Sequence, residues 1–194
     1  MEEFTVDELI RAVSSVTNVE EMNWVHFEGR IPEILKDAVP RVRALIPQAT
    51  FSLEIEKPDR HGLLELIPFF DVIFFSHTYY LRSGHATPKD FLDAVRERNP
   101  SAVYIITAGE NGAYHSSRDH PFLHIPTTKV DVVDATGAGD TVIAGFVWSW
   151  MAVRKSGVGA AKMAVKLATT KVGQEGFGNL WKRACYRVSY KPWT

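Results

Sequence analysis

Short apolar segments that alternate with helical patterns constrain the fold of this chain more than any other feature. Residues 71–75 and 102–107 are almost wholly apolar, as strands of a parallel sheet covered on both faces must be. Residues 23–27 and 51–55 are two further predicted strands, and the second alternates apolar and polar side chains. The sequence therefore predicts an α/β fold with a mostly parallel sheet.

Helix-start signals fall between these strands. Thr5 followed by Glu8 predicts a capping box at the start of a first helix. Pro32 suits the first position of a second helix, and residues 63–67 predict a short one. A further helix is expected over 87–98, because Thr and Pro at its start are typical of a helix N-terminus.

The second half of the chain predicts a hairpin, a glycine-rich loop and two helices. In chain order, the predicted elements are hairpin strands at 112–116 and 122–125, a short strand at 132–133, a helix from about 141 to 153 and a helix from about 159 to 172. The loop at 134–140 leads directly into the first of these helices, and Gly157 is expected to end it. Gly173 is a plausible residue to end the second.

Composition narrows the possible classes of protein. A chain of 194 residues with 45% hydrophobic residues is long enough for one domain with a sizeable core. The net charge of −1 predicts neither a nucleic-acid nor a membrane partner. The single cysteine excludes an internal disulfide framework, and the N-terminus lacks the apolar core of a secretory signal. These features predict a cytoplasmic protein.

The segment Asp134-Ala135-Thr136-Gly137-Ala138-Gly139-Asp140 carries the clearest chemical signal. Its small residues let the backbone approach a ligand, and the N-terminus of the following helix favours phosphate. A carboxylate beside bound phosphate would repel it, so Asp140 needs another role, and accepting a proton from an attacking hydroxyl is one. On spacing alone, an ordinary N-cap aspartate explains Asp140 equally well.

This segment resembles the C-terminal signature of the ribokinase-like (PfkB) carbohydrate kinases, usually Asp-Thr-x-Gly-Ala-Gly-Asp, and departs from it at Ala135. Residues 24–30, 54–58 and 173–177 resemble ketohexokinases in the same order. The resemblance implies a three-layer αβα fold. It also implies transfer of the ATP γ-phosphoryl group to a sugar hydroxyl, with a ketohexose-like substrate, ATP and Mg²⁺.

By the same resemblance, Asp140 is the catalytic base, and Gly137, Ala138 and Gly139 form the anion hole. The residues it assigns to the nucleotide are Thr107, Gly109, Glu110, Gly112, Asp134, Lys171 and Gly173. Glu54 is a weaker candidate for a water-mediated contact to Mg²⁺, because charged residues at a strand end are more often simply solvated. The resemblance to ketohexokinases also implies a homodimer.

The N-terminal third of the family, with its substrate loop and lid strands, has no counterpart in this sequence. We therefore expect residues 1–180 to be the C-terminal part of a kinase domain without a lid, followed by an unplaced basic tail at 181–194. Two alternatives stay open. The chain could bind nucleotide without turnover, in a regulatory role, or it could be an inactive fragment.

Overall fold

The chain falls into two units, each with its own packing. The computed structural model describes residues 4–152 and 157–185. Unit 1 contains the chain up to Ile106 together with 116–122. Unit 2 contains Thr107–His115 and the chain from Leu123 onward.

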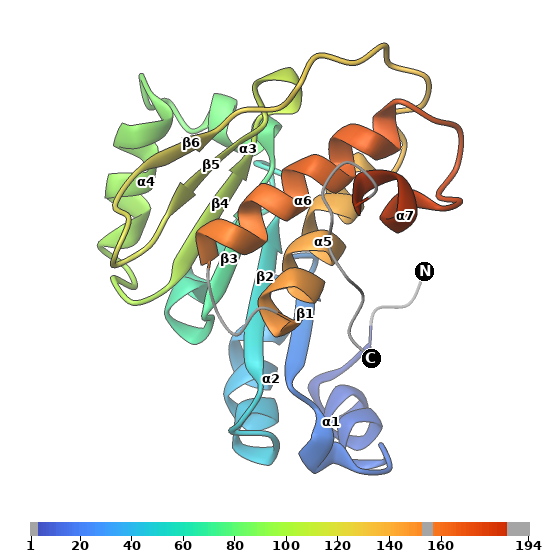
Figure 1. The fold of residues 1–194 in the computed structure, drawn as a ribbon. Coiled ribbons are helices and arrows are strands. Elements are labelled where there is room, and N and C mark those ends of the chain that lie inside the picture. The colour runs from blue at the N-terminus through green and yellow to red at the C-terminus, as the bar shows by residue number, and fades with distance from the viewer. Residues whose placement is uncertain (1–3, 153–156, 186–194) are drawn as a thin grey trace. The chain divides into compact units, whose positions relative to one another are not determined.

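Unit 1 is built on a parallel sheet. Its strands are β1 (Trp24–Glu28), β2 (Thr50–Ile55), β3 (Val72–Phe75) and β4 (Val103–Thr107), whose last residue already belongs to unit 2. They pair in this order, each parallel to the next, as Figure 1 shows. All four residues of β3 are buried, which confirms the prediction from its apolar sequence.

The helices of unit 1 are α1 (Val6–Ser14), α2 (Pro32–Leu45), α3 (His77–Arg82) and α4 (Pro88–Arg96), and its 3₁₀ turns lie at Val19–Glu21 and Leu63–Phe69. Helix α1 and the first 3₁₀ turn precede the first strand, and the other helical segments of unit 1 join successive strands, as parallel pairing requires. The capping box at Thr5 and the first-position Pro32 are both present, as predicted. The fourth helix ends at Arg96, two residues before the predicted end. Helix α3 was not predicted; Ser76 begins it by accepting a hydrogen bond from the Tyr79 N–H.

Aromatic side chains fill much of the core of unit 1. The ring of Phe75 meets that of Phe91 edge-on, with the centroids 4.8 Å apart, so that β3 is joined to α4. Tyr104 of β4 is fully buried, and its hydroxyl donates to the Asn99 carbonyl at 2.7 Å. Burial raises the pKa of Tyr104 to about 12, so this phenol stays neutral.

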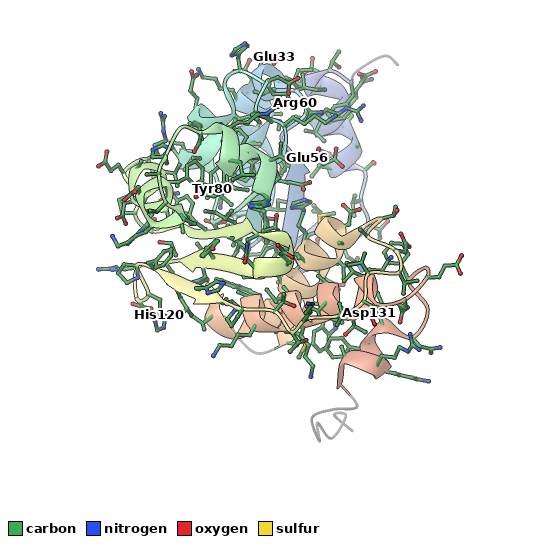
Figure 2. The ribbon with its side chains drawn as sticks, turned by 90° about the horizontal axis from the view of Figure 1, so that it is seen from above. Glu33, Glu56, Arg60, Tyr80, His120 and Asp131 are labelled. Atoms are coloured by element: carbon green, nitrogen blue, oxygen red, sulfur yellow. The ribbon has the colours of Figure 1, made fainter. Side chains whose placement is uncertain are left out.

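Glu33 and Glu56, labelled in Figure 2, are exposed on the surface of unit 1. His26 belongs to this surface as well. Its ring is exposed and shares a 2.8 Å hydrogen bond with the Ser52 hydroxyl.

Unit 2 combines a hairpin with packed helices. Strand β5 (Ala113–Ser116), whose last residue belongs to unit 1, pairs antiparallel with β6 (Leu123–Ile125), which confirms the predicted hairpin. The helices are α5 (Ala138–Ala152), α6 (Gly157–Val172) and α7 (Leu180–Cys185), preceded by a 3₁₀ turn at Gly109–Asn111. Helices α5 and α6 pack against each other, as Figure 1 shows.

The stretch between β6 and α5 differs from the prediction. No strand forms at 132–133, where both valines are more than three-fifths exposed. Helix α5 begins at Ala138 rather than Thr141, so Asp140 lies within its first turn and is not its N-cap. Gly157 begins α6, and residues 153–156 lie outside the described part.

The tail predicted from residue 181 starts as a helix. Residues 181–185 belong to α7, where Ala184 is buried, and residues 186–194 lie outside the described residues. Trp181 contacts Trp148 of α5, with ring centroids 3.8 Å apart. Within the described residues, no helix combines the length and apolar character that a membrane span needs.

Candidate phosphate-binding site

The end of α6 anchors the start of the loop at 134–140. The backbone N–H groups of Val133 and Asp134 both donate to the carbonyl of Val172, at 2.7 and 3.2 Å. The last carbonyls of a helix lack partners within the helix, so these bonds satisfy one of them. The loop thereby gains a fixed starting point without the strand that the sequence predicted.

The carboxylate of Asp134 forms the second anchor. One of its oxygens accepts a 2.7 Å hydrogen bond from the ammonium of Lys171, and the other accepts from the Thr136 N–H at 2.9 Å. The hydrogen bond from Lys171, followed by those from Thr136, holds the pKa of Asp134 well below its usual range. Asp134 is therefore ionised at neutral pH and closes the first turn of the loop.

Gly137 turns the chain into the helix. Its φ of +73° is left-handed, a conformation that glycine adopts without strain. A Cβ atom at this position would lie only 2.5 Å from the ring of Phe177. The loop therefore requires glycine here for two reasons, its backbone conformation and the close approach of the aromatic ring.

The first turn of α5 presents free backbone donors. The Thr141 N–H and hydroxyl both donate to the Gly137 carbonyl, and the Ala138 N–H donates to Ala135. Within the described residues, the N–H groups of Gly139 and Asp140 have no protein acceptor. Free N–H groups at the positive end of a helix bind anions, and here the carboxylate of Asp140 is exposed on the same turn.

A second glycine turn follows β4. The Ala108 N–H donates to the Gly112 carbonyl at 2.8 Å, which closes the turn around the 3₁₀ residues. Gly112 has a φ of +84°, and a Cβ atom there would lie 2.1 Å from the Ile125 carbonyl of β6. A Cβ on Gly109, in contrast, would meet no atom within 4 Å, so the open side of this turn can accept a ligand.

Both turns open onto one cavity, the loop cavity, of about 640 Å³. Six of the predicted site residues line it: Thr107, Gly109, Glu110, Gly112, Ala138 and Gly139. Its apolar lining comes partly from Val165 and Val172 of α6. This combination of apolar walls and a few convergent polar groups is typical of a site for a small organic ligand.

The remaining predicted residues do not line the loop cavity. Gly137 and Asp140 belong to the loop that borders it, but their atoms are not part of its lining. The ammonium of Lys171 is fully buried and is bound to Asp134, so it is not available to a nucleotide. Glu54 is a half-buried residue of β2 in unit 1, and its contact to Mg²⁺ stays a prediction.

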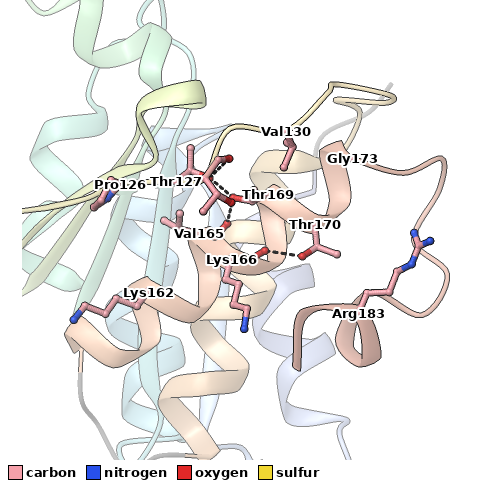
Figure 3. Close-up of a pocket in the computed structure, with 11 residues that line it drawn as sticks. Pro126, Thr127, Val130, Lys162, Val165, Lys166, Thr169, Thr170, Gly173 and Arg183 are labelled. Carbon is pink, nitrogen blue, oxygen red and sulfur yellow. Dashed lines mark hydrogen bonds between the residues drawn. The ribbon is translucent and has the colours of Figure 1, made fainter. Parts of the chain in front are cut away.

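Gly173 lines an adjoining depression of about 410 Å³, the outer groove, which Figure 3 shows. The outer groove shares Thr127, Val165 and Thr169 with the loop cavity. The φ of Gly173 is not left-handed, so the predicted C′ conformation does not occur there. The groove carries Lys162, Lys166 and Arg183, but these side chains point in different directions. The guanidinium of Arg183 donates to Gln174 instead. The groove therefore does not form a convergent anion site.

Sequence analysis missed the segment at 127–130 and one face of α6. Thr127, Thr128, Lys129 and Val130 line the loop cavity from an irregular stretch that has no motif of its own. The α6 face at Val165, Ala168 and Thr169 also lines it, and continues to Val172, which the family resemblance had placed near the adenine pocket. The spacing of three and four residues along this face was visible in the sequence but is equally typical of a core-facing helix.

Sequence comparison finds relatives of this chain among known proteins. A family model described as pfkB family carbohydrate kinase matches residues 1–183. The bifunctional protein HldE of Pseudomonas fluorescens is 37% identical over 71 residues, which cover 36% of this chain and 15% of that protein. A deoxyribokinase of Salmonella typhi is 36% identical over 96 residues, which cover 46% of this chain and 30% of that protein.

Solved structures show the same fold. A putative ribokinase II from E. coli, in complex with ATP and Mg²⁺, superposes with a TM-score of 0.73 at 18% identity, over 94% of this chain and 63% of that one. A probable sugar kinase from Rhizobium etli superposes with a TM-score of 0.72 at 20% identity, over 85% of this chain and 53% of that one. This chain thus spans little more than half the length of these structures.

Proposed function

Because this chain belongs to the pfkB family of carbohydrate kinases, we propose that its loop at 134–140 carries out phosphoryl transfer from ATP to a sugar hydroxyl. The observation that carries the proposal is the first turn of α5. The free N–H groups of Gly139 and Asp140 can receive a phosphate, and the carboxylate of Asp140 is exposed beside them.

The reaction follows from these groups. The sugar hydroxyl oxygen forms a bond to the γ-phosphorus of ATP, the bond from that phosphorus to the bridging oxygen breaks, and ADP leaves. The hydroxyl proton passes to the carboxylate of Asp140. The backbone at Gly137, Ala138 and Gly139 stabilises the charge on the transferred group, since helix N-termini and preorganised N–H groups favour it.

The loop cavity is the proposed nucleotide site. Its volume and apolar walls fit a base and ribose, and the open turn at Gly109 leaves room for a ligand along Thr107–Gly112. Within the described residues, no group of three ligating side chains could hold a metal ion. Mg²⁺ would therefore enter bound to the ATP phosphates, with few protein ligands, as this ion commonly does.

The sugar is proposed to be a ketohexose or a similar alcohol. This assignment rests on the resemblance of residues 24–30, 54–58 and 173–177 to ketohexokinases. The curated relatives point to the wider class, since one of them is a deoxyribokinase. A panel of pentoses, ketohexoses and aldohexoses in a phosphorylation assay separates these possibilities.

A second candidate is nucleotide binding without turnover. It is supported by the loop cavity, whose apolar walls and open glycine turn suit a nucleotide. Titration calorimetry distinguishes the two functions. Binding of ATP without sugar binding or ADP formation supports the second candidate, and sugar-dependent ADP formation supports the kinase.

The test of the kinase is the variant Asp140→Asn, which keeps the shape of the side chain and removes the base. We expect sugar-dependent ADP formation to fall by roughly 10²–10⁴-fold, with little change in ATP affinity. Asp131→Asn is the matched control, because Asp131 is an exposed aspartate on the stretch that precedes the loop, labelled in Figure 2. Asp131→Asn should keep the wild-type rate of ADP formation. If Asp140→Asn keeps that rate as well, Asp140 is not the base.

A further inference from the structure

Lys171 is a charged residue in a position where charge is costly. It lies in the last turn of α6 and its side chain is fully buried. Burying an ammonium without partners is strongly unfavourable. The groups that Lys171 binds therefore indicate its structural role. Its Nζ donates to the carboxylate of Asp134 at 2.7 Å and to the backbone carbonyl of the same residue at 3.0 Å.

The surroundings favour a cation at this point. The Nζ lies 5.0 Å from the centre of the Phe177 ring, within the range of a cation–π interaction. A positive charge in the last turn of a helix is also favoured by the helix dipole. Two oxygens of Asp134, an aromatic face and a helix C-terminus therefore surround one ammonium group.

These contacts all converge on the loop. Asp134 is held at its carbonyl and carboxylate by Lys171, and at its N–H by the Val172 carbonyl. Phe177, beneath the ammonium, also lies against Gly137. The ammonium thus connects the first residue of the loop with the ring that backs its central turn.

We propose that Lys171 is a positioning residue, a tethered cation that fixes the loop so that the N–H groups of Gly139 and Asp140 are held in place for phosphate. It touches neither nucleotide nor sugar. The inference rests on the proposed role of this loop, and it replaces the expectation from sequence that Lys171 binds the nucleotide directly.

Amide hydrogen exchange tests the positioning role without any ligand. Lys171→Met keeps the length of the side chain and removes the ammonium. The Thr136 N–H donates to the carboxylate of Asp134, which Lys171 no longer holds in this variant. We therefore expect amide exchange at Thr136 to become roughly tenfold faster. Lys166→Met is the matched control, since Lys166 lies on the same helix but lines the outer groove, and it should leave this exchange unchanged.

Chemical rescue tests whether the ammonium itself is what matters. Lys171→Ala leaves a cavity that ethylammonium can enter, and added ethylammonium should restore slow exchange at the loop. Tetramethylammonium, which has no N–H donor, should not restore it. Exchange in Lys171→Met should not change with either ammonium ion, because the methionine side chain fills the space.

Asp134→Asn provides a variant that tests the pair from its other side. It should loosen the loop to a similar extent, and the double variant with Lys171→Met should exchange no faster than either single variant. Additive effects of the two substitutions, or unchanged exchange in Lys171→Met, would overturn the positioning role. Equal rescue of Lys171→Ala by the two ammonium ions would overturn it as well. If the Lys171 variants fail to fold, Asp134→Asn decides: faster exchange supports the role and wild-type exchange overturns it.

Calorimetry with MgATP then separates this inference from the proposed function. Weaker ATP binding by Lys171→Met, together with ethylammonium rescue in Lys171→Ala, supports positioning for phosphate. If the wild-type chain itself does not bind ATP, the nucleotide-binding function is wrong. The exchange and rescue results still decide whether Lys171 holds the loop.

Discussion

The two units of this chain differ in the burial and the contacts of their phenylalanine side chains. In unit 1, Phe75 is completely buried and packs edge-on against Phe91. In unit 2, Phe177 is 57% exposed and lies against a glycine and a lysine of the loop region. Apolar burial stabilises unit 1, whereas glycine turns and a paired charge shape the loop of unit 2. Stability and site geometry therefore respond to different substitutions.

Truncating one phenylalanine in each unit should give the largest contrast. Phe75→Ala should lower the free energy of unfolding by about 3–5 kcal/mol, because it leaves a cavity in a packed core. Phe177→Ala should lower it by less than about 1 kcal/mol, because most of that ring is already in water. Urea denaturation followed by circular dichroism measures both values.

The order of the two variants should reverse when ATP affinity is measured, with the larger effect in Phe177→Ala. Phe177→Ala removes the ring behind Gly137 and should weaken ATP binding, although it barely affects stability. If Phe177→Ala proves as destabilising as Phe75→Ala, the exposed ring is part of a core. The contrast between the two units would then not hold.

Acid should affect unit 2 through Asp134. Because the folded pKa of this carboxyl lies below its unfolded value of about 3.9, its contribution to stability is complete above that value and is lost as pH falls below it. Asp134→Asn removes the titrating group. Thermal unfolding monitored between about pH 6 and pH 2.5 should therefore show a steeper acid loss in wild type than in Asp134→Asn. Parallel curves would show that the ion pair contributes no pH-dependent stability.

The difference between the units also explains what the sequence could predict. The strands and caps of unit 1 follow local rules: β3 is an apolar run, and Thr5 and Glu8 form a capping box that depends on neighbours three residues apart. Such signals lie within a few residues of the structure that they specify. The prediction from 71–75 was therefore confirmed almost to the residue.

The site could be predicted only in part. The loop at 134–140 is recognisable because its glycines and aspartates are consecutive. The partner of Asp134 is Lys171, which lies 37 residues later in the chain and which no local pattern connects to it. The start of α5 was placed too late because Ala138 and Gly139 carry no helix-start signal. The two valines at 132–133 predicted a short strand, but in the structure they are exposed and form no strand.

The most direct test of the phosphoryl-transfer site is a titration of the isotope-labelled chain with MgATP, followed amide by amide with NMR. We predict saturable shifts at Gly139, at Asp140 and along Thr107–Gly112, with the amides of β3 in unit 1 unaffected. The free N–H groups at the start of α5 should shift most, since they would receive phosphate oxygens. Saturable shifts confined to unit 1, or no shifts at Gly139 and Asp140, would contradict the assignment of this loop as the site of phosphoryl transfer.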